Sequence, residues 1–440
     1  MVEPSESATV RARQPKAAQL RRLNFTETVS ASLWYVPGLF VLGAFTASKI
    51  TVAIDHRLGA TEARSWLLHA DTGAAVSLTS TVAAAMLTFL GVVFSSTLIA
   101  VQLAGGQYSP RVVRVFVRSR LTHLTLAIFL ATFVFALNAL VEIRTAGNRF
   151  VPEVTVAIVY LLVFATLLAF ITFLHGFVRL LRVQYLLLIL TTSGRDALDD
   201  SYPPATAYVE AQRANVAGLE PVTVRNRGRV GVLQSVDWCR LAELARTRNA
   251  EIVLTVEVGE YIGASTALAQ TRCTEAPITD EDITSAFLLG GERTTVQDPS
   301  FVFRQLVDVA IRALSPAVND PTTAVQALDR ITDLLAGIAT RPDPTGWLID
   351  TERTARVMVP TPDFTRLALL GYVEIIRYGA DSPQVVRRLL ACFNTLDAIV
   401  AADHREVVAE LRTMLNEASR LGLPEPFNAV ARVADRHGFG

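Results

Sequence analysis

The run VTVAIVYLLVFATLLAFITFLHGFV, at residues 154–178, contains no Asp, Glu, Lys or Arg. A helix needs about 20 apolar residues to cross a hydrocarbon core of about 30 Å, so this run is long enough to span a bilayer. Three earlier segments of the chain pass the same test. The sequence therefore predicts four transmembrane helices, at about residues 29–54, 73–104, 121–141 and 154–192.

The fourth span does not end sharply at the membrane surface. After Arg179 and Arg182 the sequence stays apolar from Val183 to Leu190, and no Gly or Pro interrupts it before Gly194. We therefore expect one long helix that continues out of the bilayer. The first apolar run begins too late and is too long for a cleaved signal peptide, so we expect it to remain as an anchor.

Arginine and lysine are unevenly shared among the connections, and such residues are retained on the cytosolic side. The basic connections are the amino-terminal tail, the link between the second and third spans and the exit of the fourth span; the other two links carry acids beside their arginines. This alternation predicts a multi-pass protein of a bacterial inner membrane with both termini in the cytosol.

The composition of the 440-residue chain excludes several classes of function. The chain is 51% apolar and its formal net charge is zero, which gives no indication of nucleic acid as a partner. Its three cysteines form no metal-ligand spacing, and Lys16 and Lys49 are its only lysines. The second half therefore cannot form a Schiff base or a phosphate-binding P-loop, and we expect no cofactor and no metal.

The second span carries a continuous stripe of small and polar residues at coiled-coil spacing. Small residues allow helices to approach closely in lipid, which is one interpretation. The other is a helix that lines a hydrated path in a homo-oligomer. The candidate pore-lining residues are Ser77, Thr81, Thr88, Gly91, Ser95 and Gln102.

A basic amphipathic stretch follows this span. Arg111, Arg114 and Arg118 share one face of the helix expected there. They are expected to lie among lipid headgroups, or, repeated around an oligomer axis, to form a basic ring at the cytosolic mouth of a pore.

The rest of the chain predicts an α-helical membrane domain joined to an α+β cytosolic region. The expected parts are a cytosolic tail at 1–28, the membrane domain at 29–194, a linker at 195–220, a small β-rich subdomain at 221–275 and a helical subdomain at 276–440. Within the β-rich part, 222–225 and 230–236 are predicted to form a hairpin. The run VEVGEYIGASTAL at 256–268 resembles the turn of a biotinyl or lipoyl barrel but lacks the acceptor lysine, which predicts a small β-barrel without a prosthetic group.

The helical subdomain holds the tightest polar cluster of the cytosolic region. Ion pairs on a helix face and caps at helix starts would explain it as structural. A site for a small anion, a nucleotide or a partner loop is the alternative. The cluster consists of Arg304, Asp308, Arg312, Ser315, Asn319 and Asp320.

Four stretches together resemble one bacterial family. They are QYSPRVVRVFVRSRLTHLTL at 107–126, LQSVDWCRL at 233–241, VEVGEYI at 256–262 and QDPSFVFRQLVDVAIRALSPAVNDPTTAVQALDRI at 297–331. The family is the predicted membrane proteins with domain of unknown function 2254. The resemblance covers nearly the whole chain and implies a membrane topology, but it implies no reaction, substrate or site.

No catalytic motif nominates the chain as an enzyme. The pattern of spans, stripe and cytosolic region favours a homo-oligomeric ion channel or pore with a cytosolic regulatory domain. The alternative is a membrane-anchored sensor or scaffold whose cytosolic domain binds a ligand or a protein partner. The expected partners are the lipid bilayer, further copies of the chain, and small ions or a cytosolic ligand.

Overall fold

The computed structural model describes residues 7–11, 35–58, 72–107, 120–146, 153–202, 208–216, 218–350, 352–425 and 427–431. The chain divides into two compact units. Unit 1 comprises Met1–Arg21 and Val183–Gly440, and unit 2 comprises Arg22–Arg182. We describe each unit by itself.

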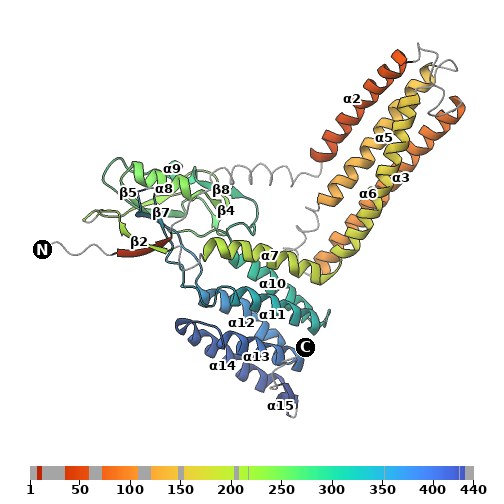
Figure 1. Ribbon diagram of the computed structural model, residues 1–440. Coiled ribbons are helices and arrows are strands. Elements are labelled where there is room, and N and C mark those ends of the chain that lie inside the picture. The colour runs from red at the N-terminus through yellow and green to blue at the C-terminus, as the bar shows by residue number, and fades with distance from the viewer. Residues whose placement is uncertain are drawn as a thin grey trace. The chain divides into compact units, whose positions relative to one another are not determined.

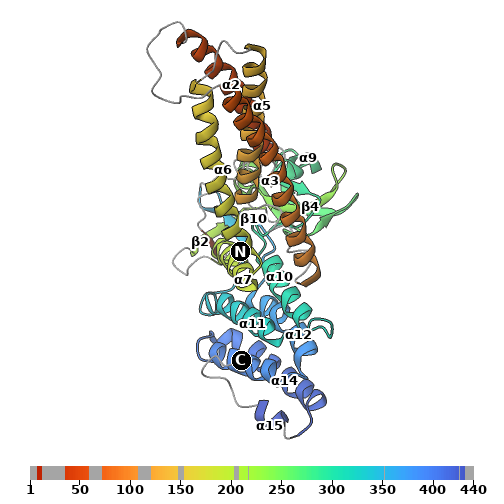
Figure 2. The same cartoon turned by 90° about the vertical axis from the view of Figure 1, so that its right-hand side faces the viewer.

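Among its described residues, unit 2 has four helices that are each long and apolar enough to cross a membrane, as the sequence predicts. Figure 2 shows them lying side by side. Residues 29–34, which belong to the first predicted span, lie outside the described residues. The helices are α2 (Tyr35–Leu58), α3 (Thr72–Gln107), α5 (Arg120–Ala146) and α6 (Glu153–Leu180).

Helix α5 packs against each of the other three helices. Ala136 and Ala139 on this helix are fully buried, and their small side chains let neighbouring helices approach closely. Aromatic rings fill the wider part of the interior: the ring centre of Phe89 lies 5.9 Å from that of Phe129 and 5.1 Å from that of Phe170. The core of unit 2 therefore combines small residues with aromatic rings.

Two sets of polar contacts also join these helices. Asp55 of α2 is buried and accepts hydrogen bonds from the backbone N–H groups of Val154 and Thr155, at 2.9 and 3.0 Å. A carboxylate on free N–H groups at a helix start satisfies them and complements the helix dipole. Lys49 of α2 also pairs with Glu142 of α5 at 2.6 Å.

The continuous helix predicted for 154–192 is wrong. Helix α6 ends at Leu180, and a separate helix α7 runs from Val183 to Ser201. At the break the N–H of Arg182 donates to the carbonyl of Arg179 at 3.1 Å. This hydrogen bond spans three residues, whereas the hydrogen bonds of an α-helix span four. Continuous apolar sequence does not reveal such a local change in backbone hydrogen bonding.

Helix α7 also overturns part of the predicted linker at 195–220. It continues to Ser201 because its buried residues recur every three or four positions, at Leu190, Thr191, Gly194, Ala197 and Leu198. This face packs against helices α10 and α11. A strand, β2 (Tyr208–Arg213), follows within the same predicted linker.

Unit 1 contains two β-sheets. A seven-stranded sheet has the order β2-β1-β9-β10-β5-β7-β3, with a further pairing of β2 with β10, and a three-stranded sheet has the order β6-β4-β8. The other strands are β1 (Ser7–Arg11), β3 (Val222–Arg225), β4 (Gly231–Val236), β5 (Ala250–Leu254), β6 (Tyr261–Ile262), β7 (Ala267–Cys273), β8 (Phe287–Gly290), β9 (Trp347–Ile349) and β10 (Thr354–Met358).

The predicted hairpin of 222–225 with 230–236 is wrong. Strand β3 pairs with β7, whereas β4 pairs with β6 and β8 in the other sheet. The buried Asn226 explains the separation, because its side-chain amide donates to the carbonyls of Arg229 and Gly263 and holds the chain between β3 and β4 in a turn. No closed barrel occurs among the residues that the structure describes, so the predicted barrel is not confirmed.

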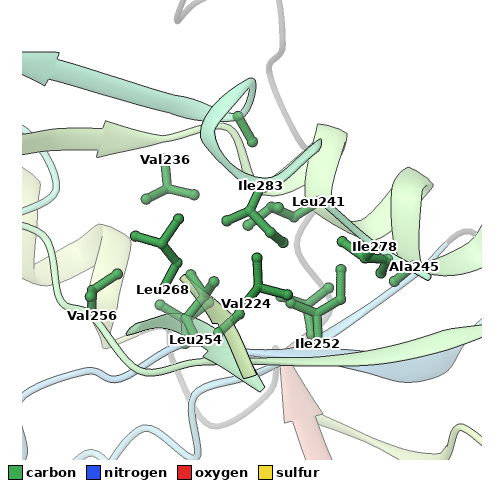
Figure 3. Close-up of a cluster of buried hydrophobic side chains, with 14 of the residues drawn as sticks. Val224, Val236, Leu241, Ala245, Ile252, Leu254, Val256, Leu268, Ile278 and Ile283 are labelled. Carbon is green, nitrogen blue, oxygen red and sulfur yellow. The ribbon is translucent and has the colours of Figure 1, made fainter. Parts of the chain in front are cut away.

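The hydrophobic core of the β region lies between the sheets and two helices, α8 (Trp238–Thr247) and α9 (Asp280–Thr284). Figure 3 shows Leu241 of α8 and Ile283 of α9 beside Ile252 and Leu254 of β5. All four side chains are at most 2% exposed. Asp237 caps α8 by accepting from the N–H of Arg240 at 3.1 Å.

The remaining helices of unit 1 form a stack that Figure 1 shows below α7. Three of these helices begin with an aspartate cap, whose side chain accepts from the backbone N–H of the residue three positions later. The caps are Asp298, Asp320 and Asp363. Strands β9 and β10 interrupt these helices and join the large sheet, so 276–440 is not wholly helical. The helices are α10 (Pro299–Ala313), α11 (Pro321–Ala336), α12 (Phe364–Gly379), α13 (Pro383–Asp397), α14 (Arg405–Gly422) and α15 (Phe427–Ala431).

Candidate functional site

Unit 1 contains a pocket of about 130 Å³ at the start of helix α10. The end of α7, the 257–260 turn and the loops around β9 and β10 supply its other walls. The side chains used below are Asp200, Trp238, Glu257, Glu260, Arg293, Asp298, Trp347 and Arg366, which all line it.

An ion pair between a buried carboxylate and a partly exposed arginine forms one wall of the pocket. The Nη2 and Nε atoms of Arg293 donate to Oδ2 of Asp298 at 2.8 and 3.0 Å, and Nη2 also reaches Oδ1 at 3.0 Å. The Asp298 side chain is 2% exposed and also caps α10 through the N–H of Phe301, at 2.9 Å. Burial raises the pKa of Asp298, and the Arg293 charge and the hydrogen bonds offset part of that rise.

The 257–260 turn covers this ion pair. Gly259 has a φ of +98°, and a Cβ there would lie 2.3 Å from Oδ2 of Asp298 and 2.7 Å from Nε of Arg293. Only glycine avoids both the backbone strain and this clash. The backbone of the turn can therefore lie directly against the Arg293–Asp298 ion pair.

Gln297 fixes the opposite wall. Its amide oxygen accepts from the N–H of Val236 at 2.9 Å, and its Nε2 donates to the carbonyl of Val236 at 3.3 Å. Trp238, two residues further along, lines the pocket. The indole Nε1 of Trp238 is buried, and no acceptor for it occurs among the described residues. A buried donor without an acceptor lowers the stability of the fold.

A second ion pair lies at the mouth of the pocket. Nη1 of Arg366 donates to Oε1 of Glu257 at 2.6 Å, and this bond raises the pKa of Arg366. The N–H of Glu257 in turn donates to Oε2 of Glu260 at 3.2 Å. Charged side chains and turn backbone therefore line this part of the pocket.

Helix α7 ends at this pocket. Asp200 and Ser201 line it, and the buried Tyr202 donates its hydroxyl to the carbonyl of Pro362 at 2.7 Å. Nη1 of Arg341 donates to the carbonyl of Tyr202 and to Oδ1 of Asp199, at 2.5 and 2.9 Å. The end of α7 is thereby fixed to the loop that forms one side of the pocket.

The predicted polar cluster separates into two structural parts. Nε of Arg304 donates to Oδ1 of Asp308 at 2.8 Å, and the same guanidinium pairs with Glu374. The other four residues are in or beside the turn between α10 and α11: Ser315 Oγ donates to the carbonyl of Arg312 at 2.7 Å, Asn319 has a φ of +48°, and Asp320 caps α11. Arg304 and Asp308 thus belong to a helix face and Asp320 to a helix start, and the binding site stays a prediction.

The predicted stripe on α3 lies on one exposed face of that helix. Ser77, Thr81, Thr88, Gly91, Ser95 and Gln102 are all exposed. The opposite face is buried, with Val82, Met86 and Val93 among its residues. A Cβ on Gly91 would have no atom within 4 Å, so this glycine serves no close approach within the chain. Arg111, Arg114 and Arg118 lie outside the described residues.

The sequence did not predict this pocket as a site, although several of its residues lie in stretches that carry the family resemblance. Trp238, the 257–260 turn and Gln297-Asp298 come from three of the four stretches that carry the family resemblance. The family resemblance that these three stretches share was the one sequence signal that connected them, because they are far apart along the chain. Among the described residues, no group of three His, Cys, Asp or Glu could hold a metal ion.

Comparisons with known proteins identify the chain as a predicted membrane protein. An uncharacterised protein of Mycobacterium tuberculosis, Rv1290c, is 28% identical over 428 residues, covering 94% of this chain and 81% of that protein. The uncharacterised protein Mb1321c of Mycobacterium bovis matches to the same extent. No solved structure matches the chain. A family model described as predicted membrane protein (DUF2254) matches residues 30–395, and the chain therefore belongs to this family of predicted membrane proteins.

Proposed function

We propose that the chain forms a homo-oligomeric pore for small ions, with α3 lining the path and unit 1 acting as a regulatory domain. The observation that carries this proposal is the exposed stripe on α3, from Ser77 to Gln102. Among the described residues, all six residues of the stripe are exposed. Both close helix packing and a hydrated path therefore require a second copy beside it.

The chemistry of the stripe supports its burial between copies. Hydroxyl and amide groups gain nothing from hydrocarbon, and polar residues in membrane spans commonly face the bundle interior or a water-filled cavity. Thr88 satisfies its hydroxyl by donating to the carbonyl of Ala84 at 3.2 Å, which leaves its oxygen able to accept from water. Gly91 allows a neighbouring backbone to come close.

The arginine pattern supports a placement in a bacterial inner membrane with both termini in the cytosol. Arg179 and Arg182 follow the last span, and positive residues are retained on the cytosolic side. A reporter fused to the carboxyl terminus tests the placement. A cytosolic reporter that is active there and an exported reporter that is inactive are the expected results, and the reverse pattern would contradict it.

Cysteine substitution on α3 tests the pore. Cys239, Cys273 and Cys392 are first replaced by alanine, and Thr88→Cys is compared with Leu87→Cys, since both positions are exposed. Successive helix residues point about 100° apart. A charged, water-soluble thiol reagent should block ion flux into liposomes through Thr88→Cys and leave Leu87→Cys conducting. Wild-type protein that adds no flux to liposomes would overturn the pore.

A second candidate function is a membrane-anchored sensor or scaffold. The observation that favours it is the pocket at the end of α7, because α7 begins three residues after α6 ends. In this function the spans serve as an anchor, and occupancy of the pocket changes what unit 1 binds. Ligand binding by purified protein that forms no oligomer and conducts no ions would favour the sensor over the pore.

A further inference from the structure

A second cavity lies inside unit 2, between three of its long apolar helices. Its volume is about 160 Å³, and residues of α3, α5 and α6 line it. Among the described residues that line it, none carries a charge. A cavity of about 150 Å³ lined by aliphatic and aromatic side chains stays dry in water and binds benzene. The cavity in unit 2 is therefore large enough for an apolar ligand.

Aromatic rings form much of the wall of this cavity. Phe89, Phe129 and Phe170 come from the three different helices, and all of them line it. The ring centre of Phe170 lies 5.1 Å from that of Phe89 and 6.4 Å from that of Phe129. Met86, a flexible apolar side chain, lines the cavity too. Such a wall offers many dispersion contacts, which suits a hydrocarbon ligand.

The two hydroxyl groups of the lining do not make the cavity suitable for water. Thr166 donates its hydroxyl to the carbonyl of Val163, within its own helix, at 2.7 Å. The other hydroxyl belongs to Thr81, at an exposed position. A buried water typically makes about three hydrogen bonds, which these two hydroxyl groups cannot supply. Water is therefore a poor occupant of the cavity.

The cavity lies at mid-span and opens sideways. Thr166 and Leu167 are the two middle residues of α6, which runs from Glu153 to Leu180. Leu167 is 54% exposed, and Thr81 of α3 is exposed as well, so the mouth of the cavity lies at the outer surface between these two helices. When α6 spans a bilayer, the hydrocarbon chains of lipids surround this mouth.

We propose that this cavity binds one hydrocarbon chain of a membrane lipid. The chain enters between Thr81 and Leu167 and ends against the three phenylalanine rings. It fills space whose lining otherwise lacks contact partners, and no charged group has to lose its hydration on binding. Because Thr81 also belongs to the stripe on α3, the bound chain lies beside that exposed face. The lipid site does not depend on whether α3 lines a pore.

Photolabelling of the wild-type chain in lipid vesicles tests this site. The vesicles contain phosphatidylethanolamine and phosphatidylglycerol, with a trace of phosphatidylglycerol that carries a diazirine in the middle of one chain. Mass spectrometry then locates the label. Phe129 and Phe135 are compared, because both are 2% exposed on α5 and only the first of them lines the cavity.

Label on Phe129 and none on Phe135 is the expected result, since a lipid outside the protein reaches neither of these buried rings. Label confined to exposed residues such as Phe164 would overturn the proposal and assign the cavity to another occupant, such as a side chain of a second copy. Equal labelling of Phe129 and Phe135 would overturn it as well.

A variant that fills the cavity gives the second test. Ala85 lines the cavity, and Ala85→Phe should lower the labelling of Phe129 by about threefold or more, because the larger ring takes the space of the chain. Ala165→Phe places the same ring at an exposed position of α6 outside the lining, so it is the matched control and should be labelled as the wild type is.

Phe135 reports on folding in these variants, because it stays unlabelled only while unit 2 remains packed. If Ala85→Phe exposes Phe135 to the label, Ala85→Leu, which adds a smaller side chain, takes its place. Unchanged labelling of Phe129 in a filled variant whose Phe135 is unlabelled would contradict the site.

Discussion

Gly259 lies so close to Asp298 that a Cβ atom on the glycine would be 2.3 Å from Oδ2 of the carboxylate. The turn and the ion pair therefore depend on each other. The turn can lie against the pair only because residue 259 has no side chain. Three separate segments of the chain, around residues 238, 259 and 298, meet at this contact.

Gly259→Ala is predicted to lower the free energy of unfolding of unit 1 by about 2–4 kcal/mol, because it combines a left-handed φ with a clash. Gly218→Ala is the matched control, since its φ is +81° and a Cβ there would meet nothing within 4 Å. The control should cost about 1 kcal/mol, from backbone strain alone. Thermal or denaturant unfolding in detergent measures both, and equal losses would contradict the predicted clash.

Asp298→Ala is predicted to cost about 2–4 kcal/mol. It leaves Arg293 without its buried partner and also removes the cap of α10. The control is Asp363→Ala, which removes only a helix cap, the hydrogen bond from the N–H of Arg366. It should lower the free energy of unfolding by about 1 kcal/mol. If both variants unfold at the same temperature, the ion pair contributes no stability beyond the cap.

Gly194→Leu is predicted to destabilise the docking of α7 by about 1–3 kcal/mol, because overpacking forces its neighbours to move. A Cβ at Gly194 would already lie 2.9 Å from Val302 Cγ1 and 3.0 Å from Leu334 Cδ1. Asp196→Leu places the same side chain at an exposed position of α7 and is the control. Limited proteolysis between α6 and α7 should be faster for Gly194→Leu alone, and equal cleavage of both variants would contradict the packing.

Asp55→Ala is predicted to destabilise unit 2 by about 2–3 kcal/mol, since it leaves two backbone donors and one hydroxyl of α6 without an acceptor. Thr155→Val removes only the hydroxyl donor and should cost about 1 kcal/mol. The unfolding temperature in detergent measures both. If Asp55→Ala loses no more stability than Thr155→Val, the hydrogen bonds from the backbone of α6 to Asp55 contribute nothing to stability.

Features governed by length or by local hydrogen bonding could be predicted from the sequence. The spans followed from apolar runs that are long enough for a bilayer. Helix starts can be predicted in the same way, because a side-chain oxygen just before helical sequence can cap the helix. The structure has such caps at Asp237, Asp298, Asp320 and Asp363. In each case the residues that decide the structure are neighbours along the chain.

Features governed by distant contacts could not be predicted. The sequence of α7 after Gly194 reads as a polar linker, and only its packing on α10 and α11 makes it helical. The pairing of β3 with β7 depends on Asn226, whose bonds reach Gly263, which lies 37 residues further along the chain. The pocket combines segments from 200 to 366, so no local pattern of residues could indicate it.

The number of subunits in the detergent-purified wild-type protein tests the central claim most directly, because a path lined by one α3 helix per copy needs a closed ring. Native mass spectrometry with lipid retained gives this number. The account predicts one discrete ring of more than two copies, which Gly91→Trp should dissociate, while Phe94→Trp, exposed beside the stripe, should leave it intact. A monomeric wild-type protein would contradict the account.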